Sequence, residues 1–239
     1  MPLQEMPELR LPQNKLAGWG NIWLGTEGSI RNGLPTPKQP FRFDKKQGMD
    51  FAAFFDQGFA EAFAAMVDVP VRSRKEKNTN CVELGDVLVV GPGIKQNYDV
   101  GYGPNGRGPR MVFDSKTLND RTSIGKNWRH MYHVLNGESA IVHDSYPYCL
   151  SSYIVVVPTP ALALTQQKDI ISALRRLGIR QHRDDALHLA EAVALVIWNP
   201  YDGSINQDIP IEPNLRLDTL SQRIYRIYAD RYGDTPPHI

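Results

Sequence analysis

An acid and a base stand two residues apart inside a short apolar stretch, Met111-Val112-Phe113-Asp114-Ser115-Lys116-Thr117-Leu118. Side chains alternate along a strand, so Asp114 and Lys116 would share one face, about 6–7 Å apart. A second stretch, residues 83–90, has the same strand length and carries Asp86. Because lone buried charges are expensive, we expect these three side chains to share a cation or an anionic substrate.

This arrangement resembles the PD-(D/E)XK nuclease superfamily, and within it the type II restriction endonucleases. The family pattern is a carboxylate at the start of one strand of a hairpin, and then an acid, any residue and a lysine on the next strand. Here Asp86 opens the first strand, and Asp114-Ser115-Lys116 is the triplet. Gly85 stands where the family usually has proline, and the triplet begins with Asp instead of the commoner Glu. The resemblance covers residues 50–200, but only a few positions carry it.

The resemblance implies hydrolysis of phosphodiester bonds in double-stranded DNA. Mg²⁺ suits this reaction because it accepts a few carboxylates and keeps open positions for water and phosphate. We expect Asp86 and Asp114 to bind Mg²⁺, with the Ser115 carbonyl as a further ligand. Lys116 would orient or deprotonate the attacking water, or alternatively form a salt bridge with one of the aspartates.

Many members of the superfamily also carry an acidic residue on the helix before the first active-site strand. Glu61 fits that place, although an exposed helix glutamate is a common alternative. Glu83 is the rival candidate for this fourth acid.

A sequence-specific type II restriction endonuclease is the function that these residues favour. Enzymes that cut palindromic sites match the symmetry of the site, so we expect a homodimer. Three alternatives remain open: a repair or junction nuclease of the same fold, a non-catalytic DNA-binding module, and a small-molecule enzyme that uses a glycine-rich loop.

Basic side chains gather around the proposed site, although the net charge of the whole chain is only +1. Residues 107–129 carry six basic and two acidic side chains, and residues 72–77 are also basic. Such clusters attract phosphate. The expected DNA contacts are Arg107, Arg110, Arg121, Lys126 and Arg129.

Residues 91–110 read as a long glycine-rich loop between the two strands. Gly101, Gly103 and Gly106 form a literal Gly-x-Gly-x-x-Gly, but this motif should open a helix and here it runs into a strand. A loop that reaches a DNA groove is therefore favoured over nucleotide binding. His130 and His133 lack further ligands at a spacing typical of zinc.

The remaining pattern predicts the elements that hold the site. A helix over 51–67 follows Asp50 as N-cap, with phenylalanines every four residues. Further helices are expected over 124–135, 166–177 and 215–232, and strands over 153–157 and 192–198. This order favours an α/β fold with a central mixed β-sheet flanked by helices, a restriction endonuclease-like core. Residues 1–48 form a Pro/Gly-rich arm or cap, docked by Trp19 and Trp23, and 49–239 form the nuclease domain.

The composition is that of a globular protein, with 41% hydrophobic and 22% charged residues in 239. We expect no membrane association, because no apolar run approaches the ~18–20 residues of a membrane span. Cys81 and Cys149 make neither a disulfide framework nor a metal-ligand spacing, and the first residues lack a secretory pattern. These features favour a cytoplasmic location.

Overall fold

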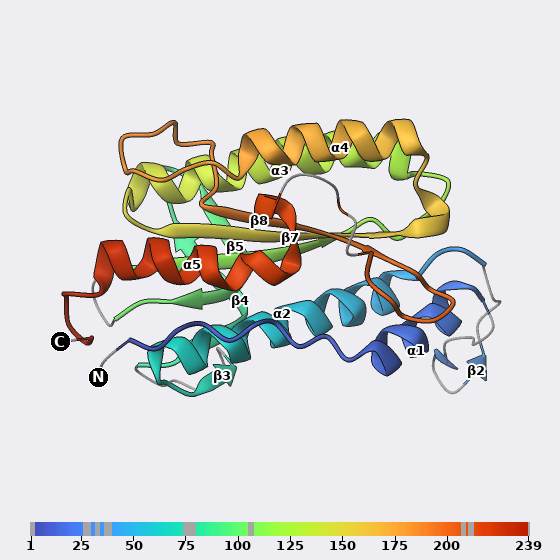
Figure 1. Cartoon of the computed structure of the whole chain (residues 1–239), viewed down its shortest axis with the longest axis horizontal. Coiled ribbons are helices and arrows are strands. Elements are labelled where there is room, and N and C mark those ends of the chain that lie inside the picture. Colours follow the sequence, from blue (N-terminus) through green and yellow to red (C-terminus); the bar gives the residue numbers. More distant parts are fainter. Residues whose placement is uncertain are drawn as a thin grey trace.

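The computed structural model describes residues 3–25, 30–31, 34–35, 40–73, 80–104, 108–206, 209 and 213–238. A six-stranded mixed sheet lies between two layers of helices (Figure 1). The elements are α1 (Gln13–Trp23), β1 (Ile30–Arg31), β2 (Leu34–Pro35), α2 (Lys45–Val67), β3 (Val71–Ser73), β4 (Val82–Val90), β5 (Lys95–Tyr102), β6 (Met111–Thr117), α3 (Ile124–Ser145), β7 (Leu150–Pro158), η1 (Thr159–Ala161), α4 (Leu164–Leu177), β8 (Ala192–Trp198), η2 (Pro213–Leu215) and α5 (Leu217–Tyr232).

The strands of the large sheet lie in the order β3-β4-β5-β6-β7-β8. Strands β4, β5 and β6 are antiparallel neighbours, whereas β6, β7 and β8 run parallel, as do β3 and β4. Both β7 and β8 are buried along their whole length, which explains their continuous apolar sequences. The expected α/β fold with a mixed sheet flanked by helices is confirmed.

Helix α2 covers one face of the sheet through its phenylalanine stripe. The Phe59 ring stacks on Phe113 of β6, with centroids 3.7 Å apart and the planes 9° from parallel. Phe63 contacts Tyr228, so α5 shares this face. Helices α3 and α4 cover the opposite face (Figure 1). Strand β6 is therefore enclosed by α2 on one side and α3 on the other.

Helix α2 begins six residues earlier than the sequence pattern suggested. Asp44 is the N-cap and forms a capping box with Gln47, which satisfies donors that would otherwise be left open. Asp50, the expected cap, lies in the first turns and pairs with Lys46 one turn before it. The capping box has the stronger geometry, so it sets the start.

The described part of the N-terminal arm packs on the main body, as expected. Trp23 is fully buried, and its Nε1 donates to the Asn119 carbonyl oxygen at 2.6 Å. Farther along, the Gln4 N–H donates to the Met66 carbonyl at 3.0 Å. The arm also contains helix α1, which its proline- and glycine-rich composition did not indicate. Trp23 thus ties α1 to the loop that follows β6.

The expected long loop over 91–110 was wrong, because residues 95–102 form strand β5. Gly101 is a packing residue there: a Cβ at this position would lie 2.5 Å from Cγ1 of Val87 on β4. Its presence reflects close strand contact, whereas a glycine in sequence usually suggests a turn.

Helix α3 also runs past its expected end at residue 135, to Ser145. Gly137 looks like a stop, but a Cβ there would meet nothing within 4 Å. A glycine in open space weakens a helix by only about 1 kcal/mol. Within the described residues, no helix is both long and apolar enough to cross a membrane.

Candidate active site

Strands β5 and β6 bring two aspartates side by side. Their antiparallel ladder pairs Val100 with Phe113, and the next residues along it are Asp99 and Asp114. Opposite residues of an antiparallel pair lie about 4.5–5.5 Å apart. Burial raises the pKa of Asp114 well above its usual value, and a hydrogen bond with Asp99 raises it further. The nearby charge of Asp99 also raises it.

Strand β5 is irregular at this point. Tyr98 donates a hydrogen bond to the Glu138 carbonyl on α3, whereas Tyr102 contacts Phe63 on α2. A regular strand would place residues 98 and 102 on the same face. The strand therefore changes face between them, at the position of Asp99.

The neighbouring strand has a matching defect. The register of β4 on β5 shifts between Leu84 and Val87, so Gly85 and Asp86 together oppose Asp99. Both have positive φ, +87° and +50°. Bulges of this kind often lie beside active sites and redirect a side chain.

Lys116 lies between two carboxylates. Its Nζ contacts Oδ2 of Asp114 and lies 3.0 Å from Oε1 of Glu138 on α3. Burial alone would lower the pKa of Lys116, but the charges of Asp114 and Glu138 outweigh it and hold the pKa above its ordinary value. Of these three side chains, only that of Lys116 is appreciably exposed, at 23% against 7% for each carboxylate. The lysine is thus the most accessible of the three.

Asp56 approaches the same strand from α2. It interacts with the backbone and side chain of Ser115, while its Oδ1 has no hydrogen-bond partner. Burial and the charge of Asp99 raise the pKa of Asp56 to about 8. Oε2 of Glu138 is likewise buried without a partner. Two carboxylates, Asp114 and Glu138, thus contact the lysine, and Asp56 and Glu138 each have one unsatisfied oxygen.

The structure places Asp114 and Lys116 together as expected, but it does not add Asp86 to them. Asp86 is exposed on β4, and β5 separates its backbone from that of Asp114 by two strand spacings, about 10 Å. Asp99 takes the place on the hairpin that the sequence analysis gave to Asp86. Strand β5 lies between β4 and β6, where the sequence pattern predicts a loop.

The sequence pattern predicts Glu61 as the fourth acid. Glu61 is exposed on α2 and accepts a hydrogen bond from Gln57 at 2.5 Å. It is Asp56, five residues earlier, that faces the strands. Ser115 is buried, and its Oγ donates to the Ala52 carbonyl at 3.2 Å. This contact holds the middle of the triplet against α2.

The expected DNA contacts divide into three groups. Arg107 lies outside the described residues. Arg110 is only 6% exposed, donates to the Pro236 carbonyl and stacks over Tyr232, so it presents no surface to DNA. The other three, Arg121, Lys126 and Arg129, are exposed at or just before the start of α3.

Three site residues were missed from sequence: Asp56, Asp99 and Glu138. On a helical wheel Asp56 lies between Phe63 and Val67, inside the apolar stripe of α2. Asp99 alternates with Tyr98, Val100 and Tyr102, and Glu138 continues a stripe of α3 beyond its expected end. For Asp56 and Glu138, a carboxylate stands where packing favours an apolar residue, which is the signal that would have found them. Asp99 gives no such signal, because a polar residue that alternates with apolar ones is ordinary in a strand.

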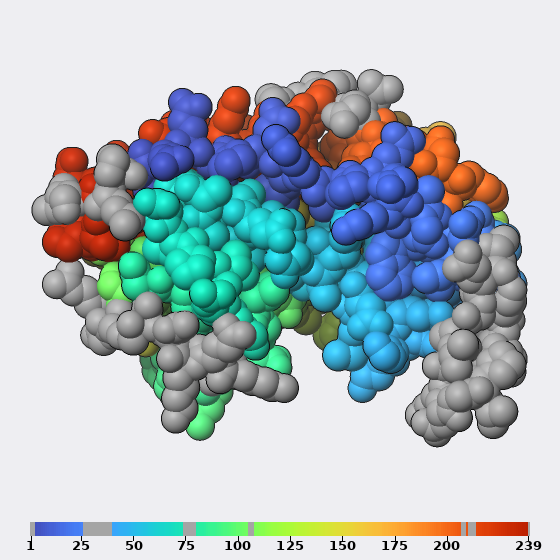
Figure 2. All heavy atoms as spheres, turned by 90° about the horizontal axis from the view of Figure 1, so that it is seen from below, coloured from blue at the N-terminus to red at the C-terminus, as the bar shows by residue number. Residues whose placement is uncertain are grey.

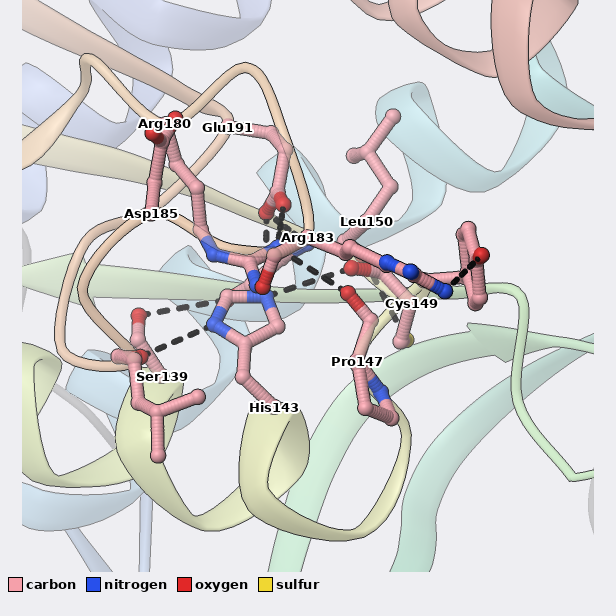
Figure 3. A network of polar contacts seen from close by, with 12 residues as sticks. Ser139, His143, Pro147, Cys149, Leu150, Arg180, Arg183, Asp185 and Glu191 are labelled. Atoms are coloured by element: carbon pink, nitrogen blue, oxygen red, sulfur yellow. Dashed lines mark hydrogen bonds and ion pairs between the residues drawn. The ribbon is translucent and has the colours of Figure 1, made fainter.

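A second buried cluster of charges lies where β7 and β8 begin (Figure 3). Its centre is Glu191, whose side chain is fully buried beside β8. Oε1 accepts from Arg180 at 2.7 Å and from Arg231 at 2.9 Å, and Oε2 accepts from the Ser151 N–H at 2.8 Å. Both oxygens are therefore fully used.

His143 completes this second cluster. Its Nδ1 lies 2.9 Å from the Leu187 carbonyl oxygen, and its Nε2 lies 3.1 Å from Oε2 of Glu191. Both partners are hydrogen-bond acceptors, so contacts on two sides fix the orientation of the ring. Burial alone would raise the pKa of Glu191, but His143 and Arg231 hold it below its usual value.

Neither cluster is a ready-made metal-binding site. The described residues contain no group of three or more His, Cys, Asp and Glu side chains arranged to hold a metal ion. Comparisons of the chain with protein-family models, curated proteins and solved structures found no match. The geometry of the two clusters therefore carries the functional argument.

Proposed function

We propose that this chain is a Mg²⁺-dependent nuclease with a restriction endonuclease-like core, which hydrolyses phosphodiester bonds of double-stranded DNA. One observation carries the proposal. Asp99 and Asp114 are neighbours on β5 and β6, and Lys116, which contacts Asp114, is the partly exposed member of the group. A pair of carboxylates beside a lysine matches the needs of a reaction on a charged phosphate.

The residues present fit a magnesium ion. Mg²⁺ keeps several waters and is often held by only one or two carboxylates together with substrate phosphates. Asp99 and Asp114 would hold it. The charge of Asp99 is one of the causes that raise the pKa of Asp114, and a cation beside both carboxylates would relieve this repulsion. When bound there, Mg²⁺ supplies Lewis-acid chemistry and makes water a better nucleophile.

Lys116 has a narrower role than the sequence suggested. Since Asp114 and Glu138 hold its pKa above the ordinary value, the amine is protonated at neutral pH. It therefore orients the attacking water or a phosphate oxygen and balances charge, and does not act as the base. Asp56 supports this arrangement by holding Ser115, the residue between the acid and the lysine.

The surface beside the site offers room for a nucleic acid. Figure 2 shows the molecule hollowed between the β4–β5 hairpin and the start of α2. A cavity of about 540 Å³ lies next to the end of β6, with Arg42, Lys45, Thr117 and Asn119 in its lining. Exposed cations at or just before the start of α3 lie on the same side, and they would contact phosphates without reading sequence.

Sequence-specific type II restriction is the form of this activity that we propose. A palindromic target would require a homodimer, since a two-fold site is matched by a two-fold protein. Sedimentation of the chain, free and bound to a short duplex, tests this part. A monomer in both states would contradict it.

The decisive experiment is incubation of the chain with plasmid DNA and Mg²⁺. We expect discrete fragments from the wild type and none from Asp99→Asn. Asp86→Asn is the matched control, because it removes the same charge from the neighbouring strand and should still cut. Equal cutting by all three proteins would contradict the proposed site. Salt-sensitive DNA binding without cleavage would identify a binding module instead.

A further inference from the structure

The ammonium group of Lys116 is held from two sides by separate elements. Asp114 comes from the same strand, and Glu138 comes from α3, 22 residues later in the chain. Lysine has a flexible four-carbon stem and a compact charge, so one contact alone orients it poorly. Two contacts from different elements restrict it far more.

Glu138 is itself firmly placed. Its side chain is 7% exposed, and its Oε1 also accepts a hydrogen bond from Gln96 at 3.1 Å. Its carbonyl oxygen accepts a second bond, from the Tyr98 hydroxyl at 2.6 Å. Gln96 and Tyr98 belong to β5, the strand that carries Asp99. The position of Glu138 is therefore set by the strand that supplies one of the proposed ligands.

The two carboxylates would respond differently to a bound cation. Asp114 would share its charge between the cation and the lysine, so its attraction for Lys116 would weaken. Glu138 contacts the lysine through Oε1 and lies on the α3 side. Its contact with Lys116 uses no oxygen of the proposed ligands Asp99 and Asp114.

We propose that Glu138 is a positioning residue that keeps the Lys116 ammonium beside Asp114 while Asp114 also holds Mg²⁺. This inference rests on the proposed nuclease function and deepens it. It gives a reason for a carboxylate at this buried position on α3. Burial there disfavours the charge and raises the pKa of Glu138, and the nearby lysine offsets this only in part. The residue does not touch substrate; it acts through Lys116.

The test follows the mobility of Lys116 by NMR relaxation of labelled lysine Cε, with and without Mg²⁺. The Lys116 signal is identified by its loss in Lys116→Met. In the wild type we expect an ordered side chain in both conditions. In Glu138→Gln we expect order without Mg²⁺ and mobility with it, an order parameter below about 0.6. Glu61→Gln is the control, because it removes an exposed glutamate on α2 and should behave as the wild type.

Kinetics provide the second measurement. Glu138→Gln should lower kcat about 10- to 100-fold, with KM for DNA unchanged, because Glu138 contacts Lys116 and not the duplex. A purely structural role would instead lower the melting temperature and leave the mobility of Lys116 independent of Mg²⁺.

The outcomes separate this inference from the nuclease proposal. An ordered Lys116 in Glu138→Gln with Mg²⁺ would overturn the role of Glu138 while leaving cleavage by the wild type intact. The side-chain carboxyl NMR signals of Asp99 and Asp114 report on the metal site. If Mg²⁺ left these signals unchanged in the wild type, both the metal site and the role of Glu138 would be contradicted. A wild type that orders Lys116 as expected but cuts no DNA would overturn only the nuclease function.

Discussion

The two buried charge clusters differ in how completely their carboxylate oxygens are satisfied, although the Nε of Arg180 in the second cluster has no partner either. Lys116 contacts two carboxylates, Asp114 and Glu138, and one oxygen each of Asp56 and Glu138 has no partner. Around Glu191, one carboxylate faces several cations and both of its oxygens are bonded. The first cluster raises carboxyl pKa values and the second lowers one.

This difference indicates what each cluster is for. A satisfied buried network stabilises and fixes a unique structure, whereas an unsatisfied one costs free energy. Unsatisfied groups persist where function requires them. We therefore infer that the Glu191 cluster joins α3, α5 and β8, and that the Lys116 cluster is kept for chemistry.

The largest expected effect is on cleavage. Asp114→Asn should lower the rate about a thousandfold or more, a loss of about 4 kcal/mol of transition-state stabilisation. The fold should remain, because asparagine has nearly the same shape as aspartate and removes a buried charge that burial and the neighbouring carboxylates disfavour. Cleavage of plasmid DNA and the urea midpoint are the measurements. Normal cleavage by the variant, or a large loss of its stability, would contradict a catalytic role for the Lys116 cluster.

The second effect is on stability. Glu191→Gln leaves Arg180 and His143 buried beside a neutral group, and breaking a buried pair in this way costs about 3–5 kcal/mol. Urea unfolding measures it. We expect the variant to unfold at clearly lower denaturant, while DNA cleavage per folded molecule is unchanged. A variant as stable as the wild type would show that the cluster does not join the elements.

The third prediction concerns the pH dependence of folding stability, which should have opposite signs for Asp56 and Glu191. Folded Asp56 keeps its proton up to about pH 8, whereas the unfolded group loses it near 3.8. Between these values the folded state binds the extra proton, so this group makes stability fall as pH rises. Asp56→Asn should remove that loss and be more stable than the wild type at alkaline pH.

Glu191 should act in the opposite direction. Its folded pKa is below the usual 4.5, so its stabilisation is present above that value and is lost as pH falls through the folded pKa. Glu191→Gln should therefore lose less stability in acid than the wild type does. Urea midpoints across the pH range measure both variants. Parallel curves for the two would contradict the comparison.

The smallest effect concerns surface cations beside each cluster. Arg121 stacks over Phe41 near the Lys116 cluster, and Arg183 stacks over Tyr148 near the Glu191 cluster. Arg121→Gln should lower the salt slope of DNA affinity by about one, whereas Arg183→Gln should not change it. DNA affinity measured at several salt concentrations tests this. Equal salt slopes for the two variants would show that DNA does not bind on the side of the Lys116 cluster.

The sequence predicted the buried elements best. Strand β8 was expected at its observed bounds and β6 within one residue, because continuous apolar runs have few alternatives. Asp114 and Lys116 were placed correctly for the same reason. Strand β5 could not be predicted because Gly101 suggests a turn, although it is required by close contact with Val87, and because residues 95–97 are polar.

The site could not be completed without the strand order. Which carboxylate faces Asp114 depends on which strand lies next to β6, and Asp86 and Asp99 are equally plausible until β5 is known. The bulge in β4 and the change of face in β5 are also set by tertiary packing. Asp56 and Glu138 come from helices on opposite faces of the sheet, a proximity that no local pattern encodes.

The bulge at Gly85 and Asp86 decides where the chain tolerates changes in length. The turn over 91–94, at the tip of the hairpin, can gain or lose a residue without altering the pairs nearer the core. Deleting one residue between Leu84 and Val87 would instead remove the bulge or slip the register by one place. Such a slip turns side chains of β4 to the other face of the strand, and the bulge that opposes Asp99 would be lost. Insertions and deletions in β4 are therefore more damaging to the site than most single substitutions there.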